Sequence, residues 1–343
     1  MKTMKDIVWY NLYLKRHRRE IFINIILLIL TMLLSVCMLS FGNTVYTPDV
    51  VLKVLQGEIL EGATFAVYTL RLPRMLAGAN AGIAFGIAGN NFQMILRNPL
   101  ASPDMIGITS GASASAVFCI LILGLSGGIV SFAAIAGGLI VASGIYLITE
   151  RGYFSGGRLI LIGIGVQAVM NAIISYLLLK ASQYDIPGAM RWLSGSLNGV
   201  KLSEIPPFLS VLILAGSIPM ILTRQIKILE LGEEHTITLG VRMNLVRGLL
   251  LGSSVILIAC ATAVTGPISF VAFLSGPIAR RLVGAGNTAV IASGMTGAIL
   301  VLLSDLIGQM AFSTRYPVGV ITGILGAPYL LFLLIQMNKK GNA

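Results

Sequence analysis

Gly78-Ala-Asn-Ala-Gly-Ile-Ala-Phe-Gly-Ile-Ala-Gly89 is a run without a charged residue that places small side chains along the faces of a helix. Small residues let helices approach closely in lipid, where packing drives helix association. The run lies inside a longer apolar segment over residues 64–96. A membrane span needs about 20 apolar residues, so this segment predicts a helix that is strongly tilted or begins outside the membrane.

The rest of the chain repeats this apolar pattern. Of its 343 residues 56% are hydrophobic and 11% are charged, whereas soluble domains carry about 25% charged residues. We therefore predict an all-α, polytopic integral membrane protein of about ten transmembrane helices. The eighth apolar run is short and contains Gly266, Pro267, Gly276 and Pro277, which predicts a broken or partial helix. The ten predicted spans are residues 21–42, 64–96, 106–124, 127–149, 159–180, 207–223, 245–265, 267–283, 287–311 and 318–337.

Basic residues predict the orientation in the membrane. The basic run from Lys15 to Arg19 precedes a first apolar run of about 21 residues, which is longer than a signal peptide's apolar core and indicates an uncleaved span. With ten spans, most of the 24 Lys and Arg residues share the side of the N-terminus, so both termini are expected to be cytoplasmic. The predicted organisation is a cytoplasmic segment at 1–20, one transmembrane domain at 21–338 with a polar cytoplasmic segment at 226–244, and a cytoplasmic tail at 339–343.

Several chemistries find no support in the sequence. No GxxxxGK[ST] motif occurs, so ATP and Mg²⁺, if they drive this protein, must be bound by a partner. The net charge of +11 reflects membrane topology rather than nucleic-acid binding, which needs a basic face on a folded domain. Cys37, Cys119 and Cys260 sit in apolar runs without metal-binding spacing. We expect this chain to bind no cofactor or metal ion and to have no catalytic residue.

Asp305 is the one acidic residue well inside a predicted span. A charge there costs about 2.5–3.5 kcal/mol on insertion scales. We interpret Asp305 as structural, hydrogen-bonded to nearby backbone, Ser304 or Gln309. The alternative is an ion-gradient-driven secondary transporter that uses Asp305 and the broken eighth helix. A membrane-embedded enzyme is a third hypothesis, for which the spans supply no catalytic set, since both histidines lie outside them.

Polar segments interrupt the apolar pattern in four informative places, the last of which, residues 315–328, opens the final span from the outside. Arg71 and Arg74 form a positive spot at the outer mouth of the second span, which suits an acidic partner surface, and Arg315 lies on the same side of the membrane. Residues 97–104 hold two prolines on the cytoplasmic side, and such rigid turns suit a constriction. Residues 226–244 could form a short helix whose apolar face lies against a soluble partner, with Leu231, Ile237 and Leu239 on that face.

At these residues the chain closely resembles the FecCD family of permeases, which serve ABC importers of iron siderophores, haem and cobalamin. The resemblance covers roughly residues 60–335, and the order and spacing of its motifs together are highly specific. The motifs are Arg71-Leu-Pro-Arg74, Gln93 through Arg97-Asn-Pro-Leu100, Ile106-Gly-Ile-Thr-Ser-Gly-Ala112, Trp192 with Gly195-Ser-Leu197, Leu231-Gly-Glu-Glu234 with Leu239-Gly240, Gly266-Pro267 with Phe270-Val271, and Pro317-Val-Gly319 through Gly326-Ala-Pro328.

The resemblance implies a ten-helix permease in the cytoplasmic membrane, paired with a second identical or homologous permease subunit. Two cytoplasmic ATPase subunits would drive it, and an extracytoplasmic substrate-binding protein or lipoprotein would deliver the cargo. The expected cargo is a ferric siderophore, with haem and cobalamin as alternatives. Arginines matching Arg71 and Arg74 meet acidic residues of the binding protein in the family, and we add Arg315 to this docking set. The expected ATPase-coupling residues are Leu231, Gly232, Glu233, Glu234, Leu239 and Gly240. The expected cytoplasmic gate residues are Asn98, Pro99, Leu100, Ser155, Gly156 and Gly157.

One departure from the family pattern follows Val271. The family often reads Val-Pro-His-Ile-Ala-Arg there, whereas this chain reads Leu274-Ser-Gly-Pro-Ile-Ala-Arg280 without a histidine. Any role that this histidine has in the family is therefore absent from the eighth span of this chain. The resemblance itself rests on the other motifs.

Overall fold

The computed structural model describes residues 4–150, 156–230, 232–284 and 286–341. These residues form helices joined by turns and short loops, which confirms the all-α prediction. The elements in chain order are α1 Met4–Ser40, α2 Pro48–Leu55, the π-helix η1 Phe65–Arg71, α3 Leu72–Ile95, η2 Pro103–Ile106, α4 Ile108–Leu121, α5 Gly128–Glu150, α6 Gly156–Lys180, α7 Ile186–Leu193, η3 Leu202–Glu204, α8 Ile205–Ile221, α9 Thr223–Glu230, α10 Glu233–Thr238, α11 Met243–Thr265, α12 Val271–Val283, α13 Val290–Met310 and α14 Val318–Gly341.

Seven helices of the described residues are long and apolar enough to cross a membrane. These seven are α1, α5, α6, α8, α11, α13 and α14. The other three predicted spans correspond to α3, which carries buried Asn and Gln side chains, and to the shorter helices α4 and α12. The polytopic architecture is therefore confirmed, and polar or short spans of this kind are tolerated where neighbouring helices rather than lipid surround them.

The eighth span is a partial helix, as the sequence predicts. α12 has only 13 residues and contains Pro277, and the backbone from Gly266 to Phe270 before it is irregular. Phe270 itself has a left-handed conformation with φ 66°. A bulky residue in that region is uncommon and marks a sharply turned entry into the helix.

The first helix does not break at residue 20, where the sequence suggests the start of a span. α1 runs without interruption from Met4 to Ser40, and its segment suited to spanning begins at Leu14. Two short helices, α2 and α7, were not predicted. Both carry a proline in their first turn, a recognised helix-start signal.

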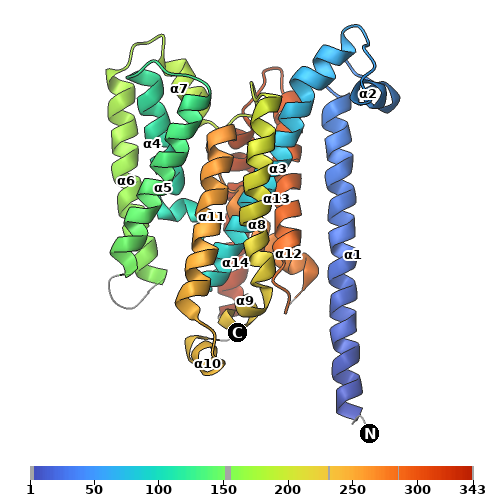
Figure 1. Ribbon diagram of the computed structural model, residues 1–343, viewed down its shortest axis with the longest axis vertical. Coiled ribbons are helices and arrows are strands. Elements are labelled where there is room, and N and C mark those ends of the chain that lie inside the picture. Colours follow the sequence, from blue (N-terminus) through green and yellow to red (C-terminus); the bar gives the residue numbers. More distant parts are fainter. Residues whose placement is uncertain (1–3, 151–155, 231, 285, 342–343) are drawn as a thin grey trace.

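The helices form a bundle with α3 near its centre (Figure 1). α3 packs against α11, α12 and α13, whereas α1 stands at one edge and α4, α5 and α6 form a group at the opposite edge. The N-terminus, the C-terminus and α10 lie at one end of the molecule, and α2 and α7 lie at the other. We call these the α10 end and the α2 end.

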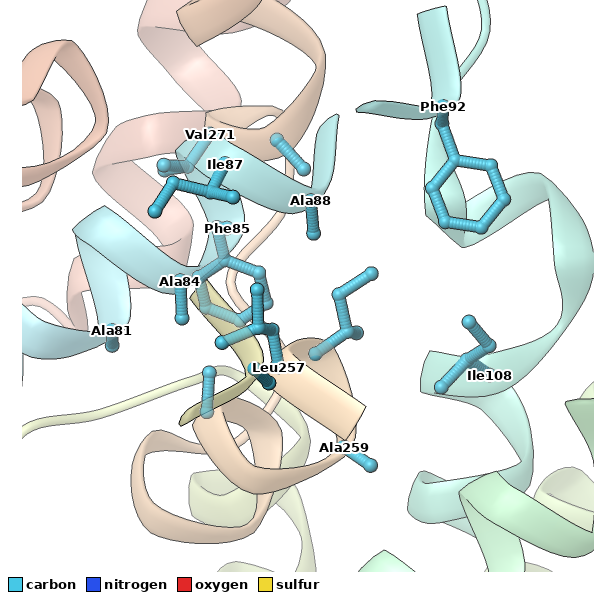
Figure 2. Close-up of a cluster of buried hydrophobic side chains, with 14 of the residues drawn as sticks. Ala81, Ala84, Phe85, Ile87, Ala88, Phe92, Ile108, Leu257, Ala259 and Val271 are labelled. Carbon is cyan, nitrogen blue, oxygen red and sulfur yellow. The ribbon is translucent and has the colours of Figure 1, made fainter. Parts of the chain in front are cut away.

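The predicted small-residue face of α3 is the centre of the core. A Cβ atom added to Gly82 would lie 2.5 Å from the Cα atom of Ala298 on α13. At Gly86 it would overlap the carbonyl oxygen of Ser293, and at Gly89 that of Ala272 on α12. Figure 2 shows Phe85 and Ile87 of α3 in the same buried cluster as Leu257 of α11 and Val271 of α12. Backbone-to-backbone packing thus holds α3 in place, as expected for helices that associate in lipid.

Candidate functional site

Arg71, predicted to dock a partner, binds the end of α1 at the α2 end of the bundle. Its guanidinium donates hydrogen bonds to the carbonyl oxygens of Leu39 at 2.8 Å, Ser40 at 2.8 Å and Thr44 at 2.6 Å. It also lies over the ring of Tyr46, 5.1 Å from the centroid. Because the last carbonyls of a helix have no partner within the helix, Arg71 caps the C-terminus of α1.

Arg74 forms a two-point ion pair with Asp305. Its Nε atom donates to Oδ2 at 2.8 Å and its Nη2 atom to Oδ1 at 2.7 Å. The Asp305 side chain is fully buried, and the Arg74 side chain is only 14% exposed. Gln309 donates to Asp305 Oδ2 at 2.5 Å, and Arg74 also donates to the side-chain oxygen of Asn198. The predicted bond between Asp305 and Gln309 is therefore confirmed, but the main partner, Arg74, was missed.

This ion pair bears on the secondary-transport hypothesis. A carboxylate that couples transport to an ion gradient must exchange its ion or proton during the cycle. Asp305 is instead held by a guanidinium in the bidentate geometry that gives strong, specific pairs. The arrangement favours the structural interpretation of Asp305.

Arg315, the third predicted docking residue, is exposed and donates to the side-chain oxygen of Asn43. Asn43 lies between Ser40 and Thr44, which Arg71 binds, so Arg71 and Arg315 converge on the loop after α1. The structure thus brings these two arginines to one loop, and Arg74 lies deeper, against α13. Of the three, Arg315 offers the most accessible charge.

A cavity of 330 Å³ at the α2 end adds residues that the sequence did not single out. Arg191 and Trp192 of α7, Asn198 and Glu204 line it. Asn198 connects this cavity to the Arg74–Asp305 pair. The sequence identified Trp192 only as part of a motif. Two charged residues on either side of that motif, Arg191 and Glu204, were the signal that could have indicated the rest of the cavity.

The predicted coupling segment forms a short helix at the α10 end, as expected. α10, which includes Glu233 and Glu234, lies between Gly232 with φ 124° and Gly240 with φ 72°. Thr236 is buried and donates to the carbonyl oxygens of Ile228 at 3.2 Å and Gly232 at 2.5 Å, which ties α10 to α9. Leu239 is 59% exposed. Leu231 lies outside the described residues.

The predicted gate residues form a tight turn directly after α3. The Asn98 side-chain oxygen accepts a bond from the backbone N–H of Leu100 at 2.9 Å, and the Asn98 carbonyl accepts one from Ala101 at 3.0 Å. Gly156, at the start of α6, is close enough to Leu96 that an added Cβ would lie 2.9 Å from its side chain. Gly157 follows in the same turn of α6, and Ser155 lies outside the described residues. The two halves of the predicted gate are therefore neighbours.

Among the described residues, no three His, Cys, Asp or Glu side chains cluster in a way that could hold a metal ion. The arrangement offers an exposed arginine at one end, a short helix followed by the exposed Leu239 at the other, and a tightly packed bundle between them.

Comparison with known proteins gives consistent matches over nearly the whole chain. Residues 27–336 match the FecCD transport family. The ferric enterobactin transport system permease protein FepG of Escherichia coli is 36% identical over 303 residues, covering 88% of this chain and 92% of that protein. The cobalamin import system permease protein BtuC of Halobacterium salinarum is 34% identical over 282 residues, covering 82% and 76%. A solved metal-chelate type ABC transporter in an inward-facing conformation is 26% identical, with a TM-score of 0.82 over 92% of this chain and 99% of that chain.

Proposed function

This chain belongs to the FecCD transport family, and from that membership we propose that its cargo is a ferric siderophore. It is a permease subunit of an ABC importer and a multi-pass protein of the cytoplasmic membrane. It catalyses no covalent step itself, since ATP is bound by a separate ATPase subunit. The observation that carries the cargo assignment is the 36% identity to a ferric enterobactin permease over nearly the full length of both chains.

The proposed working cycle uses the two ends of the bundle. The α10 end faces the cytoplasm, because most Lys and Arg residues belong to that side. The α2 end faces outward and receives the substrate-binding protein, with carboxylates of that protein meeting Arg315 and the positive region around Arg71 and Arg74. Two ATPase subunits contact residues 229–241, and a second permease subunit, identical or homologous, completes the pathway.

The decisive experiment measures uptake of radiolabelled ferric siderophore by cells with and without this chain, with one arm depleted of ATP. Uptake that needs both the chain and ATP is the expected result. Uptake that survives ATP depletion but collapses with the ion gradient would reject the assignment and restore Asp305 as a coupling residue. Labelled haem runs in parallel, and haem uptake alone would keep the mechanism but change the cargo.

Cobalamin is the second candidate cargo, because a cobalamin permease is 34% identical to this chain. Labelled cobalamin in the same assay separates the two cargoes. Cobalamin uptake without ferric siderophore uptake would replace the first proposal.

The docking role is best tested at Arg315. Replacing Arg74 also breaks the buried pair with Asp305, so a loss of uptake there would not separate docking from folding. The Arg315→Glu variant reverses an exposed charge that donates a hydrogen bond to the side chain of Asn43. We expect weaker binding of the substrate-binding protein to this variant in reconstituted vesicles, with binding restored by a carboxylate-to-lysine change on that protein. Unchanged binding would remove Arg315 from the docking set.

A further inference from the structure

The helix α3 ends in a backbone motif that favours glycine but carries Arg97. The N–H of Asn98 bonds to the carbonyl of Gln93 at 3.1 Å, and the N–H of Arg97 bonds to that of Met94 at 3.3 Å. These two bonds define a Schellman motif, in which the residue after the helix cap is left-handed and is usually glycine. Arg97 occupies that position with φ 48°. Because an L side chain is disfavoured in this conformation, Arg97 occupies the position against the usual preference for glycine.

The side chain of Arg97 reaches the helix that leads into the coupling segment. Its Nη2 atom donates to the carbonyl oxygen of Leu229 at 2.6 Å. Leu229 is buried in the last turn of α9, where carbonyls have no partner within the helix, and its carbonyl also accepts a bond from the backbone N–H of Gly232 at 3.3 Å. A cation at this position also interacts favourably with the helix dipole. Arg97 is thus a C-terminal cap for α9 contributed by a different helix.

Arg97 joins two segments of the predicted mechanism. On its own chain it is followed directly by the Asn98–Leu100 turn, which the Asn98 side chain holds rigid. Through its guanidinium it holds α9 at the residue where the 229–241 segment begins. One turn earlier, Gln93 accepts a bond from Arg280 at 2.5 Å and donates to the carbonyl of Phe273 at 2.9 Å, so the end of α3 is also fixed to α12. A displacement of α9 is therefore passed directly to the residue that carries the turn.

We propose that Arg97 is a positioning residue that transmits movement of the 229–241 segment to the turn at residues 98–100. It contacts neither cargo nor nucleotide. Its hydrogen bond makes the end of α9 and the start of the gate turn move together, so that the ATPase cycle opens and closes the turn. This inference rests on the proposed function, because it presupposes ATP-driven import.

A glycine at position 97 distinguishes the contribution of the Arg97 side chain from that of the backbone conformation. The Arg97→Gly variant removes the bond to Leu229 and suits the left-handed conformation, so the helix end keeps its shape. The Arg97→Lys variant keeps the charge and one donor but loses the planar guanidinium. The full complex, with its ATPase and binding protein, is reconstituted in vesicles, and uptake and ATP hydrolysis are measured in the same samples.

We expect Arg97→Gly to hydrolyse ATP at a near wild-type rate while the uptake per ATP falls by about tenfold, within the usual range of coupling between sites. Arg97→Lys should lie between this variant and the wild type. Equal uptake per ATP in Arg97→Gly and wild type would overturn the inference, as would a proportional fall of uptake and hydrolysis together. Absence of ATP-driven uptake in the wild-type complex would instead reject the proposed function, so the two failures are distinguishable.

A labelling experiment provides a second measurement. If Arg97 were only a structural cap, its removal would not change how the labelling rate depends on ATP. Leu100→Cys is introduced into a chain whose Cys37, Cys119 and Cys260 are serine, and its reaction rate with a thiol reagent is compared with and without ATP. We expect the rate to change with ATP when Arg97 is present and to become independent of ATP in the Arg97→Gly background. An equal ATP response in both backgrounds would contradict the inference.

Discussion

The two ends of the bundle are held together in different ways. At the α2 end, Arg71 and Arg74 make five hydrogen bonds of 2.6–2.8 Å to three carbonyl oxygens and one buried carboxylate. At the α10 end, α9 and α10 are held by Arg97 and by the hydroxyl of Thr236, each of which binds main-chain carbonyls. The α2 end thus contains a buried ion pair, whereas the α9–α10 segment is held by hydrogen bonds to main-chain carbonyls.

Arg71 and Arg74 at the α2 end therefore stabilise the fold itself. In the proposed docking, the binding protein would meet a surface that is already fixed, with Arg315 among its exposed charges. The short helix α10 packs mainly against α9 and α11 and is followed by the exposed Leu239, and regions with few buried contacts are the ones that open and move at low cost. Substitutions should therefore reduce stability most at the α2 end and coupling most at the α10 end.

The largest effect is expected for Asp305→Ala, which leaves the Arg74 guanidinium buried without its partner. Breaking a buried ion pair from one side costs about 3–5 kcal/mol. Thermal unfolding of the purified chain in detergent measures the loss. Asp305→Asn is the matched control, since it keeps the shape and one acceptor and should lose less. Equal stability of Asp305→Ala and wild type would show that the pair does not hold the α2 end.

A smaller loss is expected for Arg71→Ala, which removes the cap from the last carbonyls of α1. Hydrogen bonds from a charged group contribute about 1.5–3 kcal/mol. Arg315→Ala serves as the comparison, because it removes one exposed bond and should change the free energy of unfolding by less than about 0.5 kcal/mol. If Arg315→Ala proves as destabilising as Arg71→Ala, then Arg315 also serves the fold.

At the α10 end, Thr236→Val should cost about 0.5–1.5 kcal/mol, because the methyl group replaces a hydroxyl that bonds to Ile228 and Gly232. The effect should be local. Amide hydrogen exchange of residues 232–240 is expected to accelerate, whereas exchange in α3 stays unchanged. Faster exchange throughout the bundle would mean that α10 is part of the core rather than a surface segment.

The smallest effect on stability is expected for Leu239→Ser, since this side chain is largely exposed in the isolated chain. The unfolding temperature should remain that of the wild type. Affinity for the ATPase subunit should fall, because an exposed apolar side chain at a contact loses its burial against the partner. Unchanged ATPase affinity would place the contact elsewhere on the 229–241 segment.

The sequence predicted the helices more reliably than their connections. Ten apolar runs correspond to ten helices because hydrophobic length is a strong local signal. The short α12 was predicted from Gly266, Pro267 and Pro277 for the same local reason. The unbroken helix across residue 20 was not predicted, because the span was delimited by its apolar run. That run ends at the charged residues 15–20, whereas the helix continues through them.

The partners of side chains could be predicted only in part. Arg74 and Asp305 lie 231 positions apart in the chain, and pairing them needs the contact between α3 and α13, which no local pattern reveals. A signal existed, since an ionisable residue inside a membrane span calls for an opposite charge at the same depth. The left-handed conformation of Arg97 could not be predicted, because an arginine in the sequence does not indicate that conformation as a glycine or asparagine would.

The glycine face of α3 also determines which parts of the chain can shift independently. Where a neighbouring carbonyl rather than a flexible side chain fills the space beside Gly86 and Gly89, no change of rotamer can absorb a displacement. α3, α12 and α13 are therefore packed as one stiff block. Its boundaries along α3 are the π-helix η1 at one end and Arg97 at the other, two places where the regular helix gives way to unusual backbone.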